Sequence, residues 1–278
     1  MYVAKSQGKH CFQLYCAEID AGRDVRRELQ QDLQTAIERG EIAVLYQPIV
    51  CARSHETLGM EALARWEHPQ RGAIDPERFI PLAEESGLIV PLGQAVLAKA
   101  CREACGWGVN LAVNLSPAQF WDRRLATTIE EVLRETGFPA DRLELEITEG
   151  YLLRRPEAAG EVLARLKSIG VRIALDDFGT GFASIGYLQK LGFDSIKIDR
   201  SFVAAAVSAP KAADLARAIV GIGEALELPV TAEGVETFEQ AALMTSAGCE
   251  RLQGWLFGRP VSREEATSLI ETDLKLAG

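Results

Sequence analysis

The segment RIALDDFG, residues 172–179, decides the fold, because a short apolar run in it ends in two adjacent carboxylates. Residues 173–175 are typical of a buried strand, and buried strands do not normally end in ionisable groups such as Asp176 and Asp177. Six other short apolar runs end in the same way. Their terminal polar residues are Glu61, Asn114, Glu146, Lys197, Glu233 and Gln253.

Strand and helix patterns alternate through the rest of the chain, as expected of an α/β protein. Many strands that are separated by helices and end in polar groups fit a (β/α)8 barrel best, because all the strand ends then meet at one mouth and build the active site. The length of 278 residues matches one barrel of about 250 residues plus a short extra piece. Apolar strands at 43–50 and 57–66 are close enough to form a hairpin. The sequence therefore predicts a TIM-like (β/α)8 barrel with an irregular, partly antiparallel start.

Side-chain alternation indicates which way the strands face. Residues 143–147 place two glutamates on one face and three aliphatic side chains on the other, because strand residues point alternately to opposite faces. Residues 196–199 repeat this arrangement. We expect the aliphatic side chains to face the outer helices and the polar side chains to face the barrel axis.

The composition is that of an ordinary soluble globular protein, with 47% hydrophobic and 25% charged residues. A net charge of −10 argues against binding to a nucleic-acid polymer. No signal peptide is recognisable, and the longest apolar stretch, 88–98, is interrupted by Pro91, Gly93 and Gln94, so we expect no membrane contact by this fragment. The six cysteines form no CxxC pair and are expected to be reduced, as in a cytoplasmic protein.

The polar strand ends suit two divalent cations. Hard oxygen donors of this kind are preferred by Mg²⁺ and Mn²⁺, and clustered carboxylates cannot all stay ionised without a cation. One carboxylate of the Asp176–Asp177 pair could bridge two ions, which would stabilise the attacking and the leaving oxygens of a phosphoryl displacement. Lys197 could contact the attacking water or a phosphate oxygen. The expected oxygen donors are Glu61, Asn114, Glu146, Asp176, Asp177 and Glu233.

Other kinds of site find less support. A single acid at a strand end would more simply cap a helix or form a salt bridge, and only the whole set indicates a metal site. The three histidines, His10, His55 and His68, form no metal-spaced pair. No GxSxG, GxGxxG or Walker A motif is present.

Together these segments resemble the EAL domain, a family of cyclic di-GMP phosphodiesterases. The naming motif stands here as Glu61-Ala62-Leu63, and the eight motifs spread over about residues 25–272. The other seven are YQPIV at 46–50, NLSP at 114–117, LEITE at 145–149, DDFGTGFAS at 176–184, KIDRSFV at 197–203, AEGVE at 232–236 and QGWLFGRP at 253–260.

The resemblance implies a role for each matched residue. One metal would be held by Glu61, Asn114, Glu146 and Asp176, and the other by Asp176, Asp177 and Glu233. Catalytic roles are implied for Glu61, Lys197, Asp199, Glu149 and Gln253. Substrate contacts are implied for Gln47, Leu63, Arg65, Asn114, Asp177, Lys197, Glu236 and Gln253. In this family Glu149 would steady the loop of the DDFGTGFAS motif, which links metal occupancy to dimer contacts.

Two residues of that loop depart from the family pattern. Phe182 and Ala183 stand where Tyr and Ser are common, which removes two hydroxyl groups near the loop. Neither departure removes a metal ligand, and every ligand of the family's active pattern is present. The complete set favours a working enzyme.

Residues 1–18 resemble the end of a GGDEF (diguanylate cyclase-like) domain. The predicted organisation is therefore a GGDEF remnant over 1–20, a linker helix over 21–40 and the EAL phosphodiesterase domain over 41–278. In the linker, Asp24 can cap a helix and Gly40 is well placed to end it. This implies an upstream GGDEF-like domain in a longer protein, which could be tethered to a membrane through missing N-terminal regions.

The sequence thus predicts a bacterial signalling enzyme that hydrolyses cyclic di-GMP to linear 5′-pGpG by two-metal activation of a water. Ca²⁺ is expected to inhibit, because it should support binding without cleavage. A homodimer is expected from the family. The alternatives are a catalytically silent cyclic di-GMP receptor, an enzyme acting on another phosphodiester such as a linear dinucleotide, and a barrel whose acids are only structural.

Overall fold

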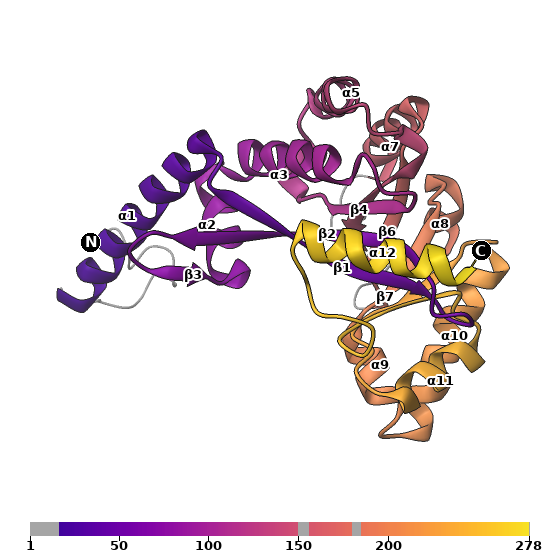
Figure 1. Ribbon diagram of the computed structural model, residues 1–278. Coiled ribbons are helices and arrows are strands. Elements are labelled where there is room, and N and C mark those ends of the chain that lie inside the picture. Colours follow the sequence, from indigo (N-terminus) through magenta and orange to yellow (C-terminus); the bar gives the residue numbers. More distant parts are fainter. Residues whose placement is uncertain (1–16, 150–155, 180–184, 278) are drawn as a thin grey trace.

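A closed barrel of eight strands lies at the centre of the computed structural model (Figure 1), which describes residues 17–149, 156–179 and 185–277. Its strands are β1 (Ile42–Cys51), β2 (Thr57–His68), β4 (Asn110–Asn114), β5 (Leu143–Thr148), β6 (Arg172–Phe178), β7 (Ser195–Ile198), β8 (Val230–Ala232) and β9 (Arg251–Gln253). Each strand pairs with the next in this order, and β9 pairs with β1. The short β3 (Gly72–Ile74) pairs only with the end of β2. The predicted (β/α)8 architecture is confirmed.

β1 runs against the other strands of the barrel. It pairs antiparallel with β2 on one side and with β9 on the other, whereas the pairs from β2 round to β9 are parallel. Only residues 52–56 connect β1 to β2. So short a connection can form a hairpin but cannot form the crossover that a parallel pair requires. The predicted antiparallel start is therefore confirmed.

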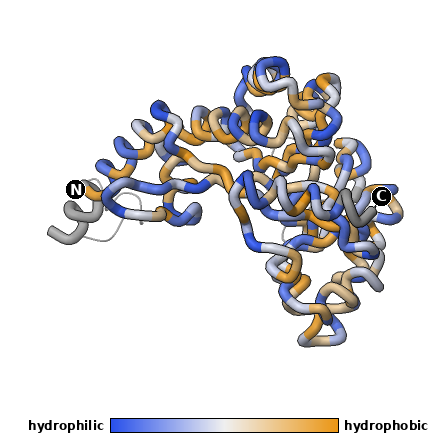
Figure 2. Tube along the Cα trace, in the orientation of Figure 1, coloured by the Kyte–Doolittle hydropathy of each residue, from blue (hydrophilic) through white to orange (hydrophobic). Residues whose placement is uncertain are grey.

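Helices cover the outside of the barrel and form a lobe beside it (Figure 1). They are α1 (Ala17–Arg39), α2 (Pro76–Ser86), α3 (Ile89–Ala104), α4 (Pro117–Phe120), α5 (Leu125–Thr136), α7 (Pro156–Ile169), α8 (Ile185–Leu191), α9 (Arg200–Ala206), α10 (Pro210–Ala225), α11 (Phe238–Ala247) and α12 (Arg263–Ala277), with a short 3₁₀ helix at Ala140–Arg142. Figure 2 shows hydrophobic and hydrophilic residues alternating along the turns of several of these helices, as expected of helices with one buried face.

The strands face as the alternation pattern predicted. Leu143 and Leu145 of β5 are fully buried in the core shared with the helices. Glu144 and Glu146 point inward and meet residues of strands that are not neighbours of β5 in the sheet. Glu144 lies 3.5 Å from Arg251 of β9, and Glu146 lies 2.6 Å from Lys197 of β7. These contacts cross the inside of the barrel, so the interior is polar at the level of Glu144 and again at the level of Glu146.

α1, α2 and the β2–β3 hairpin form the side lobe, into which β2 extends from the barrel (Figure 1). Leu29 and Leu33 of α1 are buried there. Nδ1 of the buried His68 accepts two backbone N–H groups, at 3.1 and 3.2 Å, so Nε2 carries the proton and donates it to Asp32 of α1 at 3.1 Å. β2 and α1 are thereby joined by packing and by a hydrogen bond.

The predicted helix start at Asp24 is wrong, because α1 begins at Ala17 and Asp24 lies inside it. The helix ends at Arg39, one residue before Gly40, whose φ of 68° is the left-handed conformation that glycine adopts at helix ends. Residues 1–16 of the predicted GGDEF remnant lie outside the described residues, and the division at 20 and 40 stays a prediction. Within the described ranges, every helix is too short or too polar to cross a lipid bilayer.

Candidate active site

Lys197 lies at the centre of a group of acids inside the mouth of the barrel. Its side chain projects from β7 and is 1% exposed. The Nζ atom lies 2.6 Å from a carboxylate oxygen of Glu146, 2.5 Å from one of Glu233 and 3.9 Å from one of Glu61. These three acids come from β5, from the residue after β8, and from β2. The barrel topology therefore brings together residues that are far apart in the sequence.

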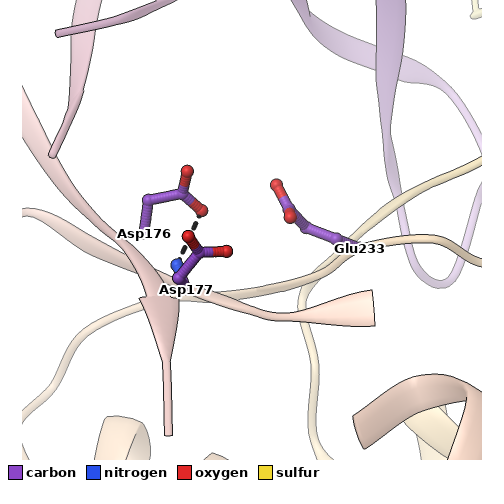
Figure 3. Close-up of side chains that lie close together, drawn as sticks. All are labelled: Asp176, Asp177 and Glu233. Atoms are coloured by element: carbon purple, nitrogen blue, oxygen red, sulfur yellow. Dashed lines mark hydrogen bonds between the residues drawn. The ribbon is translucent and has the colours of Figure 1, made fainter. Parts of the chain in front are cut away.

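A second group of acids is formed at the ends of β6 and β8. Asp176, Asp177 and Glu233 each offer a carboxylate oxygen, and these oxygens all lie within 4.8 Å of one another (Figure 3). Asp177 has a φ of 55°, which is uncommon for a residue other than glycine, and its backbone N–H donates to Asp176 Oδ1 at 2.8 Å. Because of this turn, the two adjacent carboxylates can both face Glu233. Among the described residues, this is the one group of three or more acids, histidines or cysteines with ligand atoms so close.

Two amide side chains hold Glu61 in place. Asn114 Nδ2 donates to Glu61 Oε1 at 2.5 Å, and Gln253 Nε2 donates to Glu61 Oε2 at 2.5 Å. Gln253 Nε2 also lies 3.5 Å from Gln47 Oε1. With its NH₂ group donated to Glu61, Asn114 can offer its amide oxygen to a cation. The amides thus fix one acid of the site without neutralising its charge.

Burial and mutual repulsion favour the neutral form of several acids. Burial raises the pKa of Glu146 well above its usual range; Lys197 opposes this shift, and Glu61 and Asp176 add to it. Burial also raises the pKa of Glu233 to about 8, against the attraction of Lys197. The pKa of Asp177 is raised, mainly by burial and then by Asp176. Burial lowers the pKa of Lys197, but the surrounding carboxylates outweigh this and raise it well above its usual range. One lysine does not compensate this many acids.

The donor set fits divalent cations. The buried Oε2 of Glu146 has no hydrogen-bond partner among the described residues, although buried polar atoms normally have one. Its neighbours are carboxylates and an amide, the hard oxygen ligands that Mg²⁺, Mn²⁺ and Ca²⁺ prefer. Divalent cations would remove the repulsion that otherwise favours protonation of these acids.

Two cavities open beside these residues. The first has a volume of about 250 Å³ and is lined by Gln47, Glu61, Asp176, Arg200, Glu233, Gly234, Glu236, Gln253, Gly254 and Trp255. The second has a volume of about 340 Å³, is mostly apolar and includes Leu63, Arg65 and Asn114 in its wall. An acidic cavity and an apolar cavity side by side suit a ligand that has both charged and flat apolar parts.

A model of the EAL domain family matches residues 30–260 of the chain. The chain belongs to the EAL domain family. This EAL domain is 40% identical over 276 residues to the bifunctional diguanylate cyclase/cyclic di-GMP phosphodiesterase MucR of Pseudomonas aeruginosa, covering 97% of this chain and 40% of MucR. It is 38% identical over 266 residues to the cyclic di-GMP phosphodiesterase PdeR of Escherichia coli, covering 94% of this chain and 40% of PdeR. The chain thus spans about two fifths of the length of these curated relatives.

A solved structure supports the same family fold. The complex of the PaMucR phosphodiesterase with c-di-GMP is 42% identical to this EAL domain and superposes with a TM-score of 0.83. The superposition covers 86% of this chain and 99% of that chain. The TIM-barrel fold of the family is therefore also the fold of this protein.

The EAL domain brings most of its sequence-predicted site residues to one mouth. The six expected metal ligands, Lys197, Gln47, Glu236 and Gln253 lie around the two groups of acids and the cavities. Leu63 and Arg65 lie on the wall of the apolar cavity instead of the acidic one. Glu149 accepts the backbone N–H of Gly179 at 3.3 Å, next to the loop that it was expected to steady. Phe182 and Ala183 lie outside the described residues.

Sequence reasoning missed Arg200 and Trp255, which also line the acidic cavity. Both stand inside motifs of the EAL domain, KIDRSFV and QGWLFGRP. Their place in those motifs was the available signal, but nothing in the chain itself says which motif residues face the cavity. Among the described residues, Arg200 is the one cationic side chain that lines the acidic cavity. Lys197 lies next to this cavity, against Glu233.

Asp199 could cap a helix or act through its charge at the site, and two substitutions separate these roles. Its side chain accepts the backbone N–H of Ser201 at 3.0 Å and so caps α9. We expect Asp199→Ala to lower the free energy of unfolding by about 1 kcal/mol, because the cap is lost, and Asp199→Asn to change it little, because asparagine caps equally well. Urea unfolding measures both changes. If Asp199→Asn keeps stability but loses hydrolysis, the charge of Asp199 acts at the site; equal loss of stability in both variants would contradict the capping role.

Proposed function

We propose that this EAL domain hydrolyses cyclic di-GMP to linear 5′-pGpG in a metal-dependent reaction. The observation that carries the proposal is the convergence of acids at the mouth of the barrel: Glu61, Glu146 and Glu233 surround Lys197. Asp176 and Asp177 lie next to Glu233. The family membership, the names of MucR and PdeR and the c-di-GMP complex of PaMucR support the choice of substrate. In the reaction a water oxygen bonds to one phosphorus, the bond from that phosphorus to the 3′ oxygen breaks, and the 3′ oxygen receives a proton.

The cations of the proposal are two Mg²⁺ or Mn²⁺ ions, with Ca²⁺ as an inhibitor. One ion would be held by Glu61, Asn114, Glu146 and Asp176, and the other by Asp176, Asp177 and Glu233. When bound, such ions supply a Lewis acid for the phosphate oxygens and lower the pKa of bound water. The shape of the site itself is set by the protein, through the Asn114 and Gln253 hydrogen bonds to Glu61 and the turn at Asp177.

Lys197 has a distinct task in this proposal. The ammonium group is buried between Glu146 and Glu233, which keep it protonated and fix its position. A fixed N–H donor next to the reacting phosphate would orient the water or stabilise the charge that develops on oxygen. Arg65, on the wall of the apolar cavity, is suited to a phosphate oxygen of the substrate.

Hydrolysis tests the proposal directly. The purified protein is incubated with cyclic di-GMP and Mg²⁺ or Mn²⁺, and pGpG is measured by chromatography against a sample treated with EDTA. Formation of pGpG that depends on added metal is expected. Absence of pGpG above the EDTA sample would refute the enzyme; cyclic di-GMP binding without hydrolysis would identify a receptor instead.

Divalent metal should stabilise the protein independently of any turnover. A cation at about 100 times its Kd should add about 2.7 kcal/mol to the free energy of unfolding and raise Tm by about 5–10 °C. Differential scanning calorimetry with and without Mn²⁺ measures the shift, and Glu233→Gln is expected to reduce it. An unchanged Tm would mean that the acids are structural only.

The homodimer, the upstream GGDEF-like domain and the cytoplasmic location stay predictions from the sequence. The proposal for the site does not depend on them, because each residue that it uses belongs to this chain.

A further inference from the structure

Arg200 carries a positive charge that the roles assigned so far leave unused. Its side chain is exposed and lines the acidic cavity together with Glu61, Asp176 and Glu233. Within the part of the chain that the structure describes, its guanidinium forms neither a hydrogen bond nor an ion pair. Arginine beside carboxylates commonly pairs with one of them, so a guanidinium without such a pair is available to an anionic ligand.

Lys197, the other cation of the mouth, is already engaged. Its Nζ atom lies 2.6 Å from a carboxylate oxygen of Glu146 and 2.5 Å from one of Glu233. The side chain is 1% exposed, so it stays between these acids. Additional negative charge on a ligand would therefore be met by Arg200.

The stem of Arg200 is held against the segment that carries the acids. A Cβ at Gly234 would lie 2.4 Å from the Cβ of Arg200, so only a residue without a side chain allows this approach. The backbone N–H of Glu233 donates to the Ile198 carbonyl at 3.1 Å and joins the two segments. Burial is the main cause that raises the pKa of Asp177, and Arg200 is one of the cations that oppose the rise. The arginine therefore lies beside the acids before any ligand arrives.

The proposed reaction increases the charge of the phosphate at this place. A phosphodiester carries a single negative charge, whereas the phosphomonoester left by ring opening carries about −1.5 to −2 at pH 7. The neighbouring carboxylates repel this added charge. The planar fork of an arginine matches two oxygens of a phosphate, and it is always protonated.

We propose that Arg200 binds the terminal 5′-phosphate of the linear dinucleotide that the reaction forms. The proposal rests on the proposed function and deepens it, because it assigns the charge that hydrolysis creates to a residue of this chain. Arg200 is then a product-binding residue, separate from the acids that would hold the cations. The protein should accordingly distinguish pGpG from GpG, which is the same dinucleotide without its 5′-phosphate.

Binding of these two dinucleotides tests the assignment. Titration calorimetry gives both Kd values in the presence of Ca²⁺, which is expected to support binding without cleavage. The parent protein should bind pGpG more tightly than GpG. Arg200→Gln should reduce this preference by about 5- to 20-fold, the usual effect of losing a hydrogen-bonded pair with a charged group. Arg200→Lys keeps the charge without the fork, so its preference should lie between those of the parent and Arg200→Gln.

Arg53 provides the matched control. It is an exposed arginine that follows β1, at the end of the barrel opposite the acids, and it lines neither the acidic nor the apolar cavity. Arg53→Gln removes the same charge from the protein and should leave both Kd values unchanged. In Arg200→Gln the Kd of GpG should also be unchanged, which shows that the rest of the site is intact.

Four results would overturn the assignment. They are a parent protein that binds pGpG no more tightly than GpG, an unchanged preference in Arg200→Gln, an equal loss of pGpG and GpG binding in that variant, and an equal loss of preference in Arg53→Gln. The third result would mean that the arginine contacts another part of the dinucleotide. The fourth would mean that only the net charge of the protein matters.

The outcome is separable from that of the proposed function. Hydrolysis of cyclic di-GMP by the parent protein is measured on its own. A parent protein that fails to hydrolyse but prefers pGpG through Arg200 supports the phosphate contact and refutes the enzyme. A parent protein that hydrolyses but keeps its preference in Arg200→Gln supports the enzyme and refutes the phosphate contact.

Discussion

Asp176→Asn should lower kcat/KM for cyclic di-GMP by about 100- to 1000-fold while the protein keeps its fold. Asp176 is the one residue that the proposal places on both cations, and asparagine has nearly the same shape without the negative charge. The fold should survive because Oδ1 of asparagine can still accept the backbone N–H of residue 177, as Asp176 Oδ1 does now. Steady-state hydrolysis and the circular dichroism spectrum measure the two quantities.

Asp214→Asn is the matched control for this change. Asp214 lies on α10 with an exposed side chain that pairs with Arg217, and it lines neither of the two cavities. Its replacement should leave kcat/KM unchanged. Near-normal hydrolysis by Asp176→Asn would mean that the proposed cation sites are misplaced.

Gly254→Ala should destabilise the protein by about 3 kcal/mol, because the added methyl group has no space. A Cβ at residue 254 would lie 2.1 Å from the carbonyl oxygen of Val235 and 2.2 Å from its nitrogen. Those are backbone atoms, and both take part in the hydrogen bonds that hold Gln253 and Leu256. The chain can relieve the clash only by breaking them, which would also move Glu233 and Glu236. Urea denaturation measures the free energy of unfolding.

Gly106→Ala serves as the control for Gly254→Ala. No atom lies within 4 Å of a Cβ at residue 106, so the free energy of unfolding should stay within about 0.5 kcal/mol of the parent. Equal stability of the two variants would show that the segment at Gly254 shifts without cost.

The barrel and the convergence of its acids could be predicted from the sequence, because both follow from strand geometry. The alternation of residues 143–147 is enough to send Glu146 inward, and the parallel order of the strands is enough to bring it to Lys197. The short connection before β2 is likewise enough to require a hairpin. For both the inward direction of Glu146 and the hairpin before β2, the local sequence pattern requires the same arrangement as the complete barrel.

The details of the mouth could not be predicted, because they depend on loop conformations that are set by tertiary contacts. The sequence does not show that Asp177 adopts a φ of 55°, or that Gly254 lies directly against Val235. It also does not show that Arg65 faces a different cavity from Glu236. Arg200 and Trp255 were missed for the same reason, and the chemical roles of all these residues stay predictions.

The reversed direction of β1 determines where the chain enters the barrel. Ile42, at the start of β1, lies opposite Trp66, which is beyond Glu61 on β2, so α1 arrives at the end where the acids are. In a barrel built only from parallel strands, the first strand would begin at the opposite end. α1 and Glu61 are therefore connected by a single strand, because His68 of β2 is hydrogen-bonded to Asp32 of α1 and Glu61 lies earlier on the same strand.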